Sequence, residues 1–173
     1  ERMNQVFPIV YLARHGETAW TLSGQYTGLT DLPLTERGER NARRLDERLR
    51  GVTFAKVFTS PLQRASRTCE LAGFGAVAEI ARDLLEWNYG KYEGSLTADI
   101  HKERPDWQLF RDGCPGGESP SGVGMRADRA MKRVRGEMYQ IARGVMKDKM
   151  DAAQMPDTPS TEQEQKTIEA ALE

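Results

Sequence analysis

The sequence predicts an α/β fold, because short apolar runs typical of strands alternate along the chain with segments of helical periodicity. The runs extend from Ile9 to Ala13, from Lys56 to Thr59 and from Val77 to Ala81, and each is short and rich in strand-forming residues. With 173 residues the chain is long enough for one domain with a sizeable core, and two full domains are not expected.

The first strand is expected to end at Arg14-His15-Gly16, after a polar lead-in from Glu1 to Phe7. Ligands of open α/β sheets bind outside the carboxyl ends of the strands. Arg14 supplies a planar charge there, Gly16 lets the backbone approach a ligand closely, and His15 can act as a nucleophile or an acid–base group. This combination predicts a site for an anionic substrate.

A long loop and an arginine-rich helix are expected to follow. Residues from Ala19 to Pro33 are mostly turn formers, and long loops in small domains are often functional. Thr35 is the expected N-cap of a helix that Gly51 ends. Its buried face would carry Ala42, Leu45 and Leu49. The arginines on its other faces fit a solvated surface or, alternatively, an anion-binding one (Arg37, Arg40, Arg43, Arg44, Arg48 and Arg50).

The second helix is expected to begin with Ser60 as N-cap and Pro61 at its first position. Arg64 lies in its first turn, where backbone N–H groups and the helix dipole attract anions, so Arg64 is a candidate phosphate ligand. The residues at helical spacing on its expected buried face are Leu62, Ala65, Cys69 and Ala72.

Glu86 lies between Leu85 and Trp87, after the third strand. Desolvation beside apolar side chains would raise the pKa of this carboxyl and make it a proton donor near neutral pH, although a structural salt bridge is the alternative. A short helix is expected from Leu96 to Arg104, with His101 in a structural role. Cys114 lies in a turn-rich loop that leaves room for an exposed thiol, but nothing beside it in sequence would lower the pKa of that thiol, so no chemistry is assigned to it.

The last third is helical and polar. Apolar residues recur every three or four positions and predict a long amphipathic helix from about Ser121 to Ala153. A short final helix is expected to be capped by Thr161 and Glu164. No apolar run typical of a strand follows Gly124.

Composition excludes several classes. The net charge of −1 favours neither nucleic acid nor membrane, and no apolar stretch reaches the roughly 20 residues that a membrane span needs. Two cysteines and no visible signal peptide favour a reduced, cytoplasmic setting. With only His15 and His101, a zinc site is not expected, and no acidic cluster suggests magnesium.

Five separated blocks resemble the histidine phosphatase superfamily, which includes the cofactor-dependent phosphoglycerate mutases. They occur in the family's order and together cover roughly residues 9 to 135. The last two resemble small phosphatases, including sugar-phosphate and sugar-bisphosphate phosphatases, more than true mutases. The blocks are Leu12 to Thr18, Tyr26 to Thr35, Thr59 to Ala65, Glu86 to Gly90 and Arg111 to Ser119.

The resemblance implies a doubly wound, mostly parallel sheet flanked by helices, a phosphohistidine mechanism and no bound cofactor. His15 would attack phosphorus, Arg14 and Arg64 would neutralise phosphate oxygens, and Glu86 would be the acid–base residue. Further positions that the resemblance assigns to phosphate or substrate binding are Thr21, where mutases usually have Asn, and Thr27 with Gly28.

The chain departs from the family after residue 135. The family's second catalytic histidine, in a Ser-His-Gly turn after a further strand, has no counterpart here. We therefore expect an incomplete α/β domain over residues 1–135 and a helical, polar tail over 136–173. The exposed sheet edge or the tail helix could support a homo-oligomer.

These observations favour a phosphomonoester hydrolase of a small phosphorylated metabolite, for which a sugar phosphate is one candidate, with activity impaired by the absent histidine. One alternative is a non-catalytic relative that binds a phosphorylated ligand, or a truncated or engineered variant. Another alternative is a phosphotransferase of the phosphoglycerate mutase type.

Overall fold

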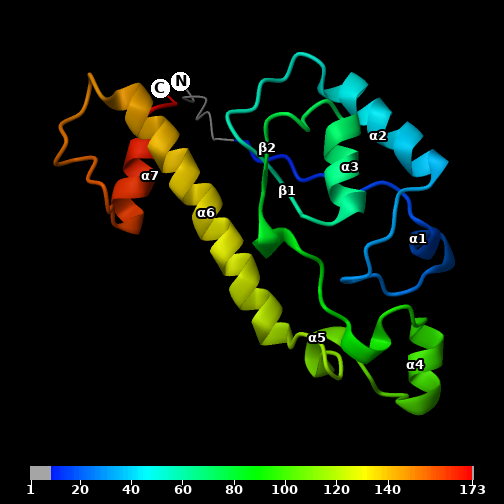
Figure 1. Ribbon diagram of the computed structural model, residues 1–173. Helices are drawn as coiled ribbons and strands as arrows, with labels where there is room; N and C mark the ends of the chain where they lie inside the picture. Colours follow the sequence, from blue (N-terminus) through cyan, green and yellow to red (C-terminus); the bar gives the residue numbers. More distant parts are fainter. Residues whose placement is uncertain (1–8, 173) are drawn as a thin grey trace, which may run out of the picture. The chain divides into compact units, whose positions relative to one another are not determined.

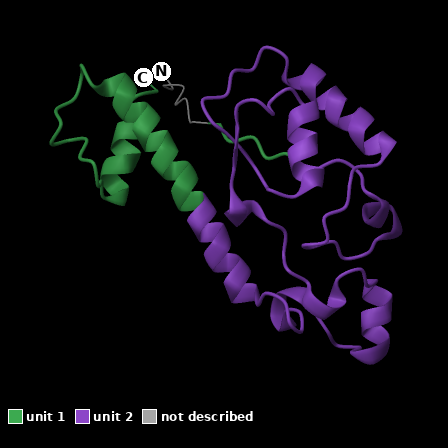
Figure 2. Cartoon of the chain, viewed as in Figure 1, with its two compact units in different colours: residues 1–13, 131–173 green, residues 14–130 purple. Residues whose placement is uncertain are grey.

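The computed structural model describes residues 9–172, so the polar lead-in from Glu1 to Phe7 lies outside the described residues. The chain divides into two compact units, Arg14–Ala130 and Glu1–Ala13 together with Met131–Glu173 (Figures 1 and 2). The helices and strands are α1 (Ala19–Ser23), α2 (Glu36–Leu49), β1 (Val57–Thr59), α3 (Gln63–Leu71), β2 (Ala78–Ile80), the short 3₁₀ helices η1 (Arg82–Leu84) and η2 (Gly90–Tyr92), α4 (Thr97–Glu103), α5 (Leu109–Asp112), α6 (Pro120–Met146) and α7 (Thr161–Ala170).

A parallel pair of strands confirms the α/β class. β1 and β2 pair in parallel with Val57 opposite Ala78 and Thr59 opposite Ile80, and α3 forms the connection between them. This arrangement is a βαβ unit, in which a parallel crossover runs through a helix. The second and third strands expected from the sequence are both present, shortened by one residue at β1 and by one at each end of β2.

The first expected strand does not form. Residues 9–13 belong to no strand of the structure, and their side chains are exposed, with Ile9 at 74% and Leu12 at 94%. Strand-forming residues stabilise a strand only when a neighbouring strand bonds its backbone and covers its apolar face. The two strands of the described sheet pair with each other, and no further strand of the described chain joins residues 9–13 in a ladder.

α1 lies inside the segment expected to be a loop. Thr18 and Thr21 form a capping box, in which each side chain accepts a hydrogen bond from the other's backbone N–H. Gly24, with φ of 78°, ends the helix in the left-handed conformation. The sequence pattern does not predict this five-residue helix, because the segment is rich in turn-forming residues and the helix depends on its caps rather than on its interior residues.

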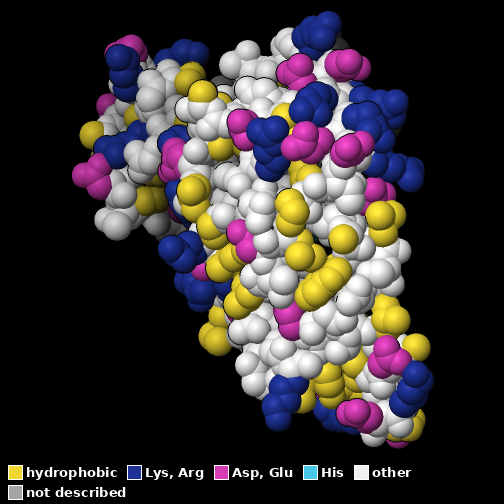
Figure 3. Space-filling view, turned by 45° about the vertical axis from the view of Figure 1, so that its right-hand side comes forward, with side chains coloured by type: hydrophobic (Ala, Val, Ile, Leu, Met, Phe, Trp, Pro, Cys, Tyr) yellow, Lys and Arg dark blue, Asp and Glu magenta, His cyan; other side chains and the backbone are white. Residues whose placement is uncertain are grey.

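α2 confirms the expected cap and polarity. The Thr35 hydroxyl accepts a hydrogen bond from the Gly38 N–H, and Ala42 is buried on the face that packs against α3. The exposed faces carry ion pairs, including Arg43 with Glu39 at 3.0 Å. Figure 3 shows basic and acidic side chains interspersed on the face it presents, as expected for a solvated surface.

α3 begins later than expected and buries different residues. Its first residue is Gln63, whose N–H donates to the Asp31 carboxylate at 2.7 Å, so Ser60 is not its cap. The buried residues of the helix itself are Arg64 and Thr68; of the expected apolar face, Leu62, Ala65 and Cys69 are half-buried, and Ala72, just after the helix, is buried as expected. The reason is that this face meets loop backbone, whose carbonyl and amide groups require polar partners.

An aromatic cluster forms a small core around α4 and α5. Ile100, Trp107 and Cys114 are buried together, and the Trp107 ring donates its N–H to the Gly113 carbonyl. Cys114 is therefore buried rather than exposed, because the turn in which it lies folds back onto Trp107. The His101 ring contacts the Trp107 carbonyl at 3.0 Å, which is a structural role as expected. Aromatic and aliphatic side chains packed against the cluster are Tyr26, Tyr89, Tyr92 and Leu109.

The unit that contains α7 has its own small core. Tyr139 of α6 is 1% exposed, packs with Ile168 of α7 and donates its hydroxyl to the Pro156 carbonyl at 2.7 Å. α6 ends at Met146, earlier than the expected Ala153, and the cap of α7 is Ser160, one residue before the expected Thr161. Among the described residues, no helix has the length and apolarity that crossing a membrane requires.

Candidate active site

The imidazole of His15 is held in one tautomer. Its Nδ1 lies 2.7 Å from the carbonyl oxygen of Gly16. Because a carbonyl oxygen can only accept, Nδ1 carries the proton and donates it, and we assign the free lone pair to Nε2. The half-buried ring therefore presents an unprotonated nitrogen, which is the form that a nucleophile requires.

The surroundings of His15 favour this neutral form. Burial lowers its pKa below the ordinary 6.5, and the positive charges of Arg64 and Arg14 lower it further. The hydrogen bond to Gly16 and the charge of Glu86 act in the opposite direction and raise the pKa. The charges of Arg14, Arg64 and Glu86, which were predicted to share a site with His15, thus all act on its imidazole within the unit Arg14–Ala130.

The segment after His15 is fixed by close contacts with α2 and α3. The Gly16 N–H donates to the Thr68 hydroxyl of α3 at 2.9 Å. A Cβ added at Gly16 would lie 2.7 Å from the Gly38 carbonyl oxygen, and one added at Gly38 would lie 2.3 Å from the Glu17 carbonyl oxygen. Both positions therefore require glycine, because the two backbone segments pass so close to each other that no Cβ fits between them.

Arg64 is buried at 1% exposure and is anchored to a loop. Its two terminal nitrogens donate to the carbonyl oxygens of Thr30 at 3.0 Å, Thr27 at 3.2 Å and Gly28 at 2.7 Å. Burial lowers the pKa of the guanidinium, and the charges of Glu86 and Asp31 oppose that shift.

Two of the five N–H donors of Arg64 stay available. Three donors bond the loop, so the Nε–H and one Nη1–H have no acceptor among the described residues. The guanidinium can therefore hold the loop and a bound oxyanion at the same time.

Glu93 holds the same loop by its amides. One carboxylate oxygen accepts hydrogen bonds from the Gly28 N–H at 2.7 Å and the Thr30 N–H at 3.1 Å. Gly28 is buried, and a Cβ there would lie 2.2 Å from the Trp87 carbonyl oxygen, so the loop passes directly beside the segment that follows Glu86. Thr27 donates its hydroxyl to the Gln25 carbonyl at 3.2 Å.

The remaining predicted site residues differ in their surroundings. Arg14 is exposed, as a residue that meets an incoming anion would be. Thr21 uses its hydroxyl in the capping box of α1, where it also donates to the Thr18 carbonyl at 2.8 Å. Glu86 is exposed, and its carboxylate accepts the Trp87 N–H at 2.8 Å. The desolvation expected beside Leu85 and Trp87 is wrong, because the Glu86 side chain is exposed, and no salt bridge of the described chain involves Glu86 either.

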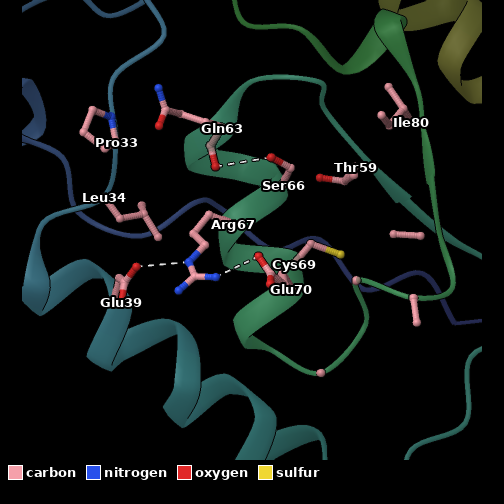
Figure 4. Close-up of a pocket in the computed structure, with 14 residues that line it drawn as sticks. Pro33, Leu34, Glu39, Thr59, Gln63, Ser66, Arg67, Cys69, Glu70 and Ile80 are labelled. Atoms are coloured by element: carbon pink, nitrogen blue, oxygen red, sulfur yellow. Dashed lines mark hydrogen bonds and ion pairs between the residues drawn. The ribbon is translucent and has the colours of Figure 1, made fainter.

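A hollow in the structure lies away from these residues. A cavity of about 830 Å³ runs along α3 beside Thr59, Cys69 and Ile80, and none of the predicted site residues lines it (Figure 4). Arg67 lies between Glu39 and Glu70 (Figure 4), and its guanidinium nitrogens are 3.0 and 2.8 Å from their carboxylate oxygens. The charged side chains that line the cavity, Glu39, Arg67 and Glu70, are paired with one another, so the cavity offers no free positive charge for a phosphate. Among the described residues, no group of three or more metal-binding side chains is found.

Sequence reasoning missed three residues that hold the site together, namely Glu93, Glu118 and Arg126. Arg126 forms a double ion pair with Glu118 and bonds the backbone before and at Glu86. Glu118 lies in a block that resembles the family, but nothing local separates it from a solvated carboxylate. In the sequence Arg126 resembles the other arginines of a solvated helix, and only the structure shows the carboxylate and carbonyl oxygens to which it donates.

A sequence model described as the histidine phosphatase superfamily (branch 1) matches residues 10–143. The chain belongs to the histidine phosphatase superfamily. This confirms the resemblance found in the five sequence blocks and the α/β class that it implies.

The relatives of this chain carry the names of phosphatases and of a mutase. It is 40% identical over 156 residues to the sedoheptulose 1,7-bisphosphatase of Saccharomyces cerevisiae, covering 76% of this chain and 57% of the relative. It is 42% identical over 122 residues to the acid phosphatase of Mycobacterium tuberculosis, covering 69% and 60%. A probable phosphoglycerate mutase GpmB of Cronobacter sakazakii is 34% identical over 120 residues.

Solved structures show the same relationship. The open reading frame Rv3214 of Mycobacterium tuberculosis matches with a TM-score of 0.64 and 41% identity, covering 68% of this chain and 62% of that one. TTHB049 of Thermus thermophilus matches with a TM-score of 0.60 and 40% identity, covering 69% and 68%. The chain spans about 57–60% of the length of the first two relatives that it matches.

Proposed function

We propose that this protein is a phosphomonoester hydrolase that works through a phosphohistidine on His15. The observation that carries the proposal is the 2.7 Å contact between Nδ1 of His15 and the Gly16 carbonyl oxygen, from which we assign the proton to Nδ1 and the nucleophilic lone pair to Nε2. Arg64 supports it with two donors beyond those spent on the loop, and Arg14 adds a second exposed positive charge.

In the first half-reaction Nε2 of His15 attacks phosphorus, and the P–N bond forms as the bond to the ester oxygen breaks. Glu86 gives its proton to that leaving oxygen. In the second half-reaction water attacks phosphorus, the Glu86 carboxylate takes the proton of the water, and the P–N bond breaks to release phosphate. Arg14 and Arg64 neutralise the equatorial oxygens, whose charge the transition state spreads.

The proposed substrate is a small phosphorylated metabolite, with sugar phosphates as the first class to test. The name of the yeast relative, sedoheptulose 1,7-bisphosphatase, supports that choice. A phosphotransferase of the phosphoglycerate mutase type is the second candidate, and the GpmB relatives support it. The two candidates differ in the acceptor of the phosphoryl group: a hydrolase transfers it to water, and a phosphotransferase transfers it to a second substrate hydroxyl.

We propose further that turnover by the 173-residue chain is slow. The sequence holds only His15 and His101, and His101 is bonded to Trp107 in a structural role. The family's second histidine, by resemblance, helps to hold the phosphate and the transition state, and losing one such contact costs about 10²–10³ in rate. If the loss of rate is complete, the protein binds a phosphorylated ligand without turnover.

Steady-state hydrolysis of 4-nitrophenyl phosphate tests the proposal. We expect slow turnover that His15→Ala abolishes and that His101→Ala, the matched histidine control, leaves unchanged. Turnover should rise about 10²–10³-fold in a chimera that carries the Ser-His-Gly segment of a relative. Turnover that survives His15→Ala contradicts the proposal, whereas phosphate binding without any turnover selects the non-catalytic alternative.

A further inference from the structure

Arg126, at the start of α6, uses every donor of its guanidinium. Its Nε and one Nη2 hydrogen bond the two carboxylate oxygens of Glu118 at 3.0 and 2.8 Å. Its Nη1 donates to the carbonyl oxygens of Asp83, at 3.0 Å, and Leu85, and Nη2 also donates to that of Glu86 at 3.4 Å. These contacts account for all five N–H groups that an arginine has.

Glu118 continues the hold on the other side of Glu86. Its second carboxylate oxygen accepts the Asn88 N–H at 3.0 Å, its backbone N–H donates to the Asn88 carbonyl at 2.9 Å, and its carbonyl accepts the indole N–H of Trp87 at 3.0 Å. The Arg126 side chain is 13% exposed and that of Glu118 is 28% exposed. The pair is therefore mostly shielded from water, where a bidentate ion pair is at its strongest.

The segment held in this way is otherwise irregular. Glu86 lies outside every helix and strand, its side chain is exposed, and its carboxylate has one hydrogen bond, to the N–H of the next residue. A proton donor must lie within about 2.6–3.2 Å of the leaving oxygen, and a misplacement of about 1 Å costs about 10²-fold. The backbone of Glu86 needs an external support, and Arg126 is the side chain that bonds its carbonyl.

We propose that Arg126 is the positioning residue of Glu86, acting in concert with Glu118 and without touching substrate itself. This inference rests on the proposed function, in which Glu86 protonates the leaving oxygen. The role belongs to arginine alone, because lysine keeps the charge but has three donors and no planar fork. Arg126→Lys should therefore loosen the segment that carries Glu86 while leaving His15 and Arg64 in place.

The test compares two substrates with leaving groups of different basicity. Phenyl phosphate needs its leaving oxygen protonated, because phenol has a pKa of about 10, as tyrosine has. 2,4-Dinitrophenyl phosphate releases a stable anion and needs little protonation. In Arg126→Lys we expect kcat/KM to fall about 10²-fold for phenyl phosphate and less than about threefold for the dinitrophenyl ester.

Arg129→Lys is the matched control. Arg129 lies one turn further along α6 and bonds the side chain of Asp83 at 2.9 Å rather than the backbone that leads to Glu86. We expect both esters to react in this variant as in the parent chain. The retained rate with the dinitrophenyl ester also serves as the folding control for Arg126→Lys, because it requires His15 and Arg64 in their places.

The two esters separate a positioning role of Arg126 from a general loss of structure. Equal rates for parent and Arg126→Lys, or an equal fall with both esters, overturn it. If neither ester shows hydrolysis that depends on His15, the proposed function fails, and amide hydrogen exchange decides the inference instead. Exchange at Trp87 and Asn88 that is about tenfold faster in Arg126→Lys, but not in Arg129→Lys, upholds the positioning role, and unchanged exchange overturns it.

Discussion

Arg64 and Glu93 hold the same four-residue loop, Arg64 through three of its carbonyl oxygens and Glu93 through two of its amides. The loop, residues 27–30, contains Gly28, which both side chains bond. The charge of Glu93 also favours the protonated form of Arg64. The position of the buried guanidinium therefore depends on a carboxylate that does not bond it directly.

Removing the Glu93 carboxylate should destabilise the fold. Glu93→Ala leaves the N–H groups of Gly28 and Thr30 without their acceptor, which costs about 1–3 kcal/mol in the free energy of unfolding. Glu93→Gln keeps one acceptor oxygen and should cost less. Urea denaturation measures the effect, with Glu103→Ala, an exposed glutamate of α4, as control. Equal stabilities of Glu93→Ala and Glu103→Ala would show that the loop does not need this acceptor.

Replacing Arg64 should weaken phosphate binding. In Arg64→Lys the three ammonium donors are needed for the loop carbonyls, so none is left for an oxyanion. Hydrogen bonds to charged groups contribute about 1.5–3 kcal/mol, which corresponds to a Kd raised about 10- to 150-fold. Isothermal titration with inorganic phosphate measures this. Arg44→Lys, on the exposed face of α2, should bind as the parent does, and the assignment fails if Arg64→Lys does so too.

The pH dependence of phosphoryl transfer should reflect the lowered pKa of His15. Transfer requires neutral His15, and its pKa lies below the ordinary 6.5 because of burial and of Arg64 and Arg14. Activity should therefore persist below pH 6.5 and decline only as the pH falls through the lowered pKa. In Arg14→Gln, which removes one positive charge, this acidic limb should move to higher pH. The pH profile of kcat/KM measures both, and an acidic limb above pH 6.5 in the parent chain would refute the expectation.

Acid should weaken the ion pair between Glu118 and Arg126. The hydrogen bonds from Arg126 lower the pKa of Glu118 below its ordinary 4.5. A lowered carboxyl pKa contributes stability that is present above the unfolded value and is lost as the pH falls through the folded value. Glu118→Gln should therefore cost about 1–3 kcal/mol at neutral pH and progressively less below about pH 4.5. Unfolding measured from pH 7 to pH 3 checks this, and a pH-independent difference would exclude the ion pair as its cause.

Local patterns predicted the elements whose stability is local. The Thr35 cap, the paired strands β1 and β2, and the place of Arg64 in the first turn of α3 follow from hydroxyl caps and apolar runs within a few residues. Local patterns failed for residues 9–13, where apolar residues typical of a strand form none. A strand depends on a neighbour, which no local pattern supplies.

The sequence by itself predicted the family and the α/β class, and it proposed the set His15, Arg14, Arg64 and Glu86 from the types and order of these residues. The tertiary structure alone decided which groups hold that set in place. Glu93 accepts from a loop more than sixty residues earlier in the chain, and Arg126 donates to carbonyls about forty residues earlier. Such contacts join backbone groups that every residue possesses, so no side-chain pattern marks their acceptors in advance.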